Sequence, residues 1–93
     1  PMASRRKLKK TIKFVSSELI TDIYFRLLMS KSVKEETVDQ LVVKIVDLNR
    51  EFVLRASHPN GKDNPKIIKQ YYTKLYTDWQ DKLAGILKEI EVL

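Results

Sequence analysis

The chain contains no cysteine, and its 93 residues include only two glycines and three prolines. Without thiols it cannot form disulfides, zinc–thiolate sites, iron–sulfur clusters or a cysteine nucleophile. An all-β sandwich or barrel needs a turn about every 8–12 residues, and so few turn-forming residues do not supply them. The longest uncharged run has six residues, whereas a membrane-spanning helix needs about 20 apolar residues. We therefore expect no membrane span.

The remaining composition is that of one small globular domain. Apolar residues make up 43% of the chain, too many for an intrinsically disordered segment. A domain of this size buries about 60–65% of the surface that its unfolded chain exposes, which leaves little room for a deep cleft beside the core. We predict a single helical-bundle domain over residues 1–93, with residues 1–6 as a disordered basic tail. Pro1, which precedes Met2, is interpreted as a cloning remnant.

Apolar residues recur every three or four positions over residues 7–31, 33–57 and 65–91, which predicts three long helices. Ser32 and Glu35 have the spacing of a capping box at the start of the second helix. Asn64 and Pro65 fit the N-cap and first position of the third helix. Long helices joined by short breaks predict an all-α fold, an antiparallel up-down-up three-helix bundle with a coiled-coil-like crossing angle.

The first predicted helix is apolar on two opposite sides. The side that fits the core carries Leu8, Ile12, Leu19 and Ile23. The opposite side carries an outer ridge that consists of Phe14, Thr21, Phe25 and Leu28. The other two helices are expected to keep mostly polar backs. Single exposed apolar residues are normal on any surface, but residues in line predict a contact with a protein partner or with a second copy in a homodimer.

Positive charge is concentrated in two segments. Residues 1–13 carry six Lys and Arg and no acidic residue, and residues 55–74 carry five Lys and Arg against one Asp. An up-down-up bundle brings both segments to one end, which we call the basic end. Its candidate anion-binding residues are Arg5, Arg6, Lys7, Lys9, Lys10, Lys13, Lys62, Lys66 and Lys69. The basic end is expected to attract anionic partners, most commonly nucleic acid. The alternative is that these charges only keep the protein in solution.

Aromatic residues near the basic end offer only weak support for nucleic-acid binding. Phe14, Tyr71 and Tyr72 could stack on bases, although the two tyrosines lie on an apolar arc that favours packing in the core. Neither a helix-turn-helix nor a sheet-based RNA motif is present. The first helix could also lie on an anionic membrane surface, but the apolar residues that would insert are those the core requires.

No catalytic or metal-binding constellation can be assembled from the sequence. His58 is the only histidine and precedes Pro59 in a loop, without the partners that nucleophilic catalysis requires. Glu35, Glu36 and Asp39 fit the first turn of a helix, where the helix dipole favours acidic side chains, better than a cation site. We therefore expect no enzymatic activity, cofactor, metal or small-molecule substrate.

Asn49 and the loop over residues 58–65 each allow a structural and a functional interpretation. Asn49 lies near the centre of the apolar arc of the second helix. A buried Asn there would fix helix register or oligomeric state, and a ligand contact is the alternative. The loop over residues 58–65 is interpreted as a well-capped turn or as a recognition loop at the basic end.

The sequence predicts a non-enzymatic interaction module that self-associates or packs on a protein partner through the outer ridge. The alternative is a nucleic-acid-binding accessory protein that uses the basic end. The basic N-terminal segment could imitate a targeting peptide, but Glu18 and Asp22 interrupt the apolar stretch of a signal sequence and the helical pattern continues beyond it. A cytoplasmic location is therefore expected.

Overall fold

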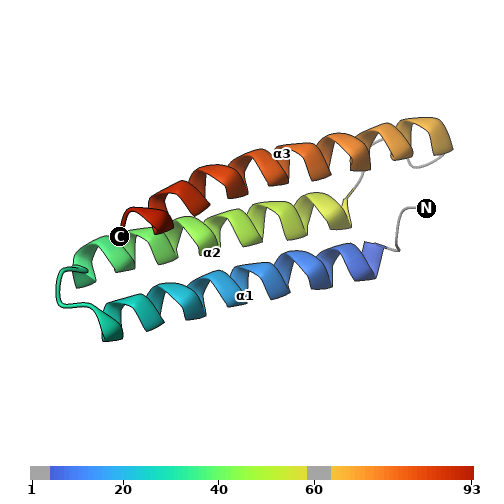
Figure 1. Ribbon diagram of the computed structural model, residues 1–93. Coiled ribbons are helices and arrows are strands. Elements are labelled where there is room, and N and C mark those ends of the chain that lie inside the picture. The colour runs from blue at the N-terminus through green and yellow to red at the C-terminus, as the bar shows by residue number, and fades with distance from the viewer. Residues whose placement is uncertain (1–4, 59–63) are drawn as a thin grey trace.

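The computed structural model describes residues 5–58 and 64–93, which fold into three α-helices. These are α1 (Arg5–Met29), α2 (Glu35–Ser57) and α3 (Pro65–Glu91). Successive helices run in opposite directions, so the start of α1 lies at the same end as the end of α2 (Figure 1). The rod measures 53 × 20 × 19 Å, about two helix diameters across. The predicted all-α three-helix bundle is confirmed.

The first two helices begin at positions other than those predicted. Helix α1 starts at Arg5, so Arg5 and Arg6 belong to the helix and not to a disordered tail. Helix α2 starts at Glu35 after Lys34, which makes no side-chain capping hydrogen bond. The predicted capping box is wrong because Val33 is buried against the core and leaves Ser32 in the turn. There, the hydroxyls of Ser32 and Ser30 share a 2.9 Å hydrogen bond.

Helix α3 begins and ends as predicted, at Pro65 and Glu91. The Asn64 side-chain oxygen accepts hydrogen bonds from the backbone N–H groups of Lys66 at 3.0 Å and Ile67 at 3.3 Å. These bonds satisfy donors that have no partner within the helix, so the predicted N-cap is confirmed. Pro59, Asn60, Gly61 and Lys62 lie outside the described residues.

Large aliphatic side chains and one phenylalanine fill the space between the helices. The largest fully buried side chains are Phe52, Ile12, Ile23, Ile45, Leu75 and Val38. Burial of each such side chain contributes about 1.5–3 kcal/mol of favourable transfer free energy. The side of α1 predicted to face the core does so, because Leu8, Ile12 and Ile23 are buried and Leu19 packs against them half-buried. The core therefore occupies one side of α1 and leaves the opposite side to solvent.

Ion pairs connect α2 to α3 along their shared seam. The pairs are Lys44–Glu89 at 2.8 Å, Glu51–Lys82 at 3.1 Å and Arg55–Asp78 at 3.0 Å. Hydrogen bonds from Lys74 and Arg55 lower the pKa of the Asp78 carboxyl. The first two pairs are exposed and stabilise the fold only weakly, whereas Arg55–Asp78 is partly buried. The spacing of all three pairs matches one alignment of the two antiparallel helices.

Candidate functional site

The outer ridge of α1 is exposed over its whole length. Phe14, Phe25 and Leu28 expose 65%, 58% and 78% of their surface, and Thr21 between them is also exposed. Phe14, Thr21 and Leu28 follow one another at seven-residue intervals, which drift only about 20° per step around an α-helix. They form a nearly straight line about 21 Å long at 1.5 Å per residue. Met29, with 66% exposed, extends the apolar surface at the end of α1.

Apolar exposure on the other helices is greater than the sequence indicated. Val43 and Leu54 are exposed on α2, although most exposed residues of this helix are polar, as expected. Tyr76 and Leu87, which belong to the apolar recurrence over residues 65–91, are both more than two-fifths exposed. Three helices bury a narrower arc than the apolar residues of α3 span, so the edges of that arc remain at the surface. The outer ridge still differs from these sites, because it contains Phe14 and Phe25, which are both exposed. The third phenylalanine, Phe52, is buried in the core.

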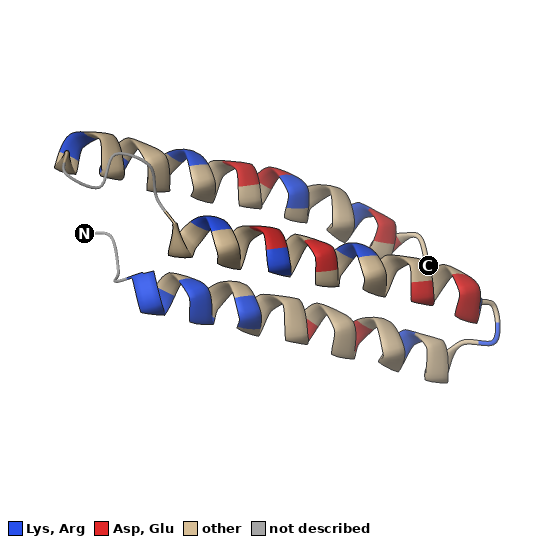
Figure 2. Cartoon of the chain, turned by 180° about the vertical axis from the view of Figure 1, so that it is seen from behind, with Lys and Arg blue, Asp and Glu red and all other residues tan. Residues whose placement is uncertain are grey.

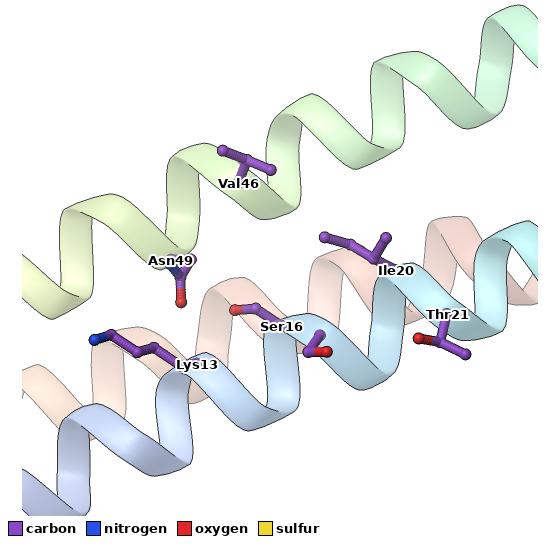
Figure 3. A pocket seen from close by; sticks show the side chains of 7 residues that line it. Lys13, Ser16, Ile20, Thr21, Val46 and Asn49 are labelled. Carbon is purple, nitrogen blue, oxygen red and sulfur yellow. The ribbon is translucent and has the colours of Figure 1, made fainter.

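A hollow of about 310 Å³ lies beside the ridge, between α1 and α2. It is lined by Lys13, Ser16, Ser17, Ile20, Thr21, Val46 and Asn49. Figure 3 shows the Asn49 side chain pointing from α2 toward α1. Its Oδ1 atom is inaccessible to solvent and has no hydrogen-bond partner among the described residues. Asn49 is half-buried at the edge of this hollow and not at the centre of the core.

The start of α1 is held against the end of α2. Arg5 Nη1 donates to the Ser57 carbonyl at 3.5 Å, and Lys9 Nζ donates to the Ser57 hydroxyl at 3.3 Å. Lys and Arg residues are concentrated at this end of the bundle, where α3 also begins, and acidic residues lie nearer the opposite end (Figure 2). Lys66 and Lys69 are exposed in the first turns of α3. The described members of the two basic segments therefore lie at one end of the bundle.

Tyr71 and Tyr72 hold the last turn of α2. The Tyr71 hydroxyl donates to the Arg55 carbonyl at 2.8 Å, and the Tyr72 hydroxyl donates to the Ala56 carbonyl at 2.7 Å. The two rings meet edge to face, with centroids 5.5 Å apart. Because Tyr72 is buried and Tyr71 half-buried, both tyrosines serve packing and helix-end capping rather than an open stacking surface.

The other polar candidates lie at the two ends of α2. His58 follows the end of α2, and its carbonyl accepts a hydrogen bond from Tyr71 at 3.4 Å. Glu35, Glu36 and Asp39 are exposed near the start of α2. Within residues 5–58 and 64–93, no three His, Asp or Glu side chains converge to hold a metal ion. No helix in these two ranges is both long enough and apolar enough to cross a bilayer.

Comparison of the chain with protein-family models, curated proteins and solved structures finds no match. A function is therefore inferred from two surfaces of the molecule, the outer ridge and the basic end.

Proposed function

We propose that the chain is a non-enzymatic helical interaction module that self-associates through the outer ridge of α1. The observation that carries this proposal is the alignment of Phe14, Phe25 and Leu28 on the side of α1 away from the core, each more than half exposed. Burial of an exposed phenylalanine or leucine contributes about 1.5–3 kcal/mol, and association removes several such side chains from water at once. Aligned apolar side chains of this size are characteristic of protein-binding surfaces.

Replacement of Phe14 and Phe25 by serine tests the role of the ridge. We expect the unaltered chain to be dimeric at tens of micromolar by size exclusion with light scattering. The F14S/F25S variant should be monomeric and should retain its helical circular-dichroism spectrum, because both side chains lie outside the core. Val43→Ser with Leu54→Ser is the matched control, since these α2 residues are similarly exposed. A monomeric unaltered chain, or equal loss of the dimer in the control, would contradict the proposal.

Nucleic-acid binding through the basic end is a second candidate function. It is favoured by the contacts that Arg5 and Lys9 make with Ser57, which hold the basic start of α1 in place. Arg6, Lys10 and Lys13 are exposed and form no ion pair with any residue that the structure describes. Exposed cations without an ion pair are available to neutralise phosphates. Phosphate neutralisation releases counterions from the nucleic acid, which favours binding.

A salt series of fluorescence-anisotropy titrations with mixed-sequence DNA and RNA tests this second function. We expect micromolar binding near 50 mM salt. The triple variant R6Q/K10Q/K13Q should reduce the log–log salt slope by up to about three, because each lost phosphate contact lowers it by roughly 0.9. K31Q/K34Q/K88Q removes the same number of charges from the other end of the bundle and should leave the slope unchanged. Absence of binding at about 50 mM salt, or equal effects of both variants, would exclude this function.

A further inference from the structure

We infer that the outer ridge binds a second copy of this chain with the two α1 helices antiparallel, so that Thr21 faces the partner's Thr21. This inference rests on the proposed self-association and adds the orientation and register of the two copies. Three properties of the described residues carry it: the symmetry of the ridge, the distribution of charge along α1, and the exposed apolar area.

Three of the four ridge residues are spaced symmetrically about Thr21. Phe14 precedes Thr21 by seven residues and Leu28 follows it by seven. A two-fold interface uses the same surface patch on both copies. In an antiparallel pair centred on Thr21, Phe14 of each copy therefore lies against the partner's Leu28, and Phe25 lies against the partner's Ser17. Thr21 is the smallest residue of the ridge and stands at the centre, where the two helices approach most closely.

The charge along α1 separates the antiparallel from the parallel arrangement. All six charged residues of residues 5–13 are basic. A parallel pair would place two such segments side by side, and like charges brought together across an interface cost several kcal/mol. An antiparallel pair moves them to opposite ends of the dimer. Each then lies nearer to the opposite end of the other copy, where residues 26–40 and 85–93 carry four Lys and Arg against five Asp and Glu.

The exposed apolar area matches a weak dimer. An aromatic side chain offers roughly 150–250 Å², so the exposed parts of Phe14 and Phe25 leave about 200–300 Å² on each copy. With Leu28 and Met29, two copies would bury on the order of 1,000 Å², at the lower limit for a specific interface. We therefore expect a dissociation constant in the micromolar range, with folded monomers at high dilution.

Single-cysteine variants test the orientation, because the chain has no cysteine of its own. Thr21→Cys should form a disulfide-linked dimer when the protein is oxidised with copper phenanthroline at tens of micromolar. Ser17→Cys is the matched variant. Ser17 is exposed and lies about one helical turn before Thr21, and its replacement leaves all four ridge residues in place. In the antiparallel pair the two thiols of S17C lie about 12 Å apart along the axis, too far for a disulfide. In a parallel pair they would lie opposite each other. We therefore expect a linked dimer for T21C and none for S17C.

The outcomes separate this inference from the proposed function. A linked dimer from S17C, or no linked dimer from T21C while light scattering shows a dimer, would overturn the antiparallel register and leave self-association intact. A monomer by light scattering for the unaltered chain would overturn self-association itself. Denaturing electrophoresis with and without reductant, on samples diluted after quenching with N-ethylmaleimide, distinguishes specific linkage from random collision.

Discussion

Replacement of Phe52 by alanine is expected to lower the free energy of unfolding by about 3–5 kcal/mol, the usual cost of removing a buried aromatic side chain. Phe52 is fully buried and is the largest of the fully buried side chains. The guanidinium of Arg55 lies 4.7 Å from its ring centroid and the ammonium of Lys82 lies 5.6 Å away. Both cations also form ion pairs along the α2–α3 seam, so loss of the ring removes packing and both cation–π contacts together.

Phe25→Ala provides the matched comparison, because the same side chain is removed from an exposed position of α1. Its effect on the free energy of unfolding should be within about 0.5 kcal/mol, as for most surface substitutions. Urea denaturation followed by circular dichroism, at a protein concentration low enough to keep the chain monomeric, measures both values. Equal destabilisation by the two variants would mean that Phe25 belongs to the folding core, contrary to the proposed role of the outer ridge.

Replacement of Asn49 by leucine is expected to stabilise the fold by about 1 kcal/mol and to raise Tm by roughly 4–8 °C. The Asn49 Oδ1 atom is buried without a partner among the described residues, and an unsatisfied buried acceptor costs about 1–3 kcal/mol. Leucine has the same branching and the same number of side-chain heavy atoms as asparagine, and no polar atom. It would add apolar contacts beside Ile20 and Val46, which line the same hollow.

Thermal unfolding followed by circular dichroism measures this effect. Ser17→Ala is the control, because Ser17 lines the same hollow but is exposed, and its Tm should stay within about 2 °C of the unaltered value. An unchanged or lower Tm for Asn49→Leu would show that water or a ligand satisfies Oδ1.

The helical architecture was predictable because it depends on local chemistry. The apolar periodicity over residues 65–91, together with the Asn64–Pro65 start signal, gave both ends of α3 correctly. The start of α2 was predicted incorrectly because tertiary packing, and not the local sequence, determines where this helix begins. Val33 is buried against the core, and that burial outweighs the capping box that Ser32 and Glu35 would form locally. The spacing of Ser32 and Glu35 indicates the local preference for a capping box, but it does not indicate that Val33 packs on the core.

The surfaces were predictable only in part. Helical geometry alone places Phe14, Thr21, Phe25 and Leu28 opposite the core side of α1, and all four are exposed. Periodicity does not give the distance between helices. The exposure of Tyr76 and the hollow beside Asn49 depend on that distance, so neither could be derived from the spacing of residues.

The last turn of α2 accepts hydrogen bonds from both neighbouring helices, from Lys9 on α1 and from the hydroxyls of Tyr71 and Tyr72 on α3. A terminal helical turn ordinarily frays, and a ligand that binds such a turn must first order it. Here the intramolecular hydrogen bonds have already removed that backbone freedom. A polyanion that binds the basic end would therefore lose little affinity to backbone ordering, and the entropic cost of its binding would come mainly from immobilising the lysine and arginine side chains.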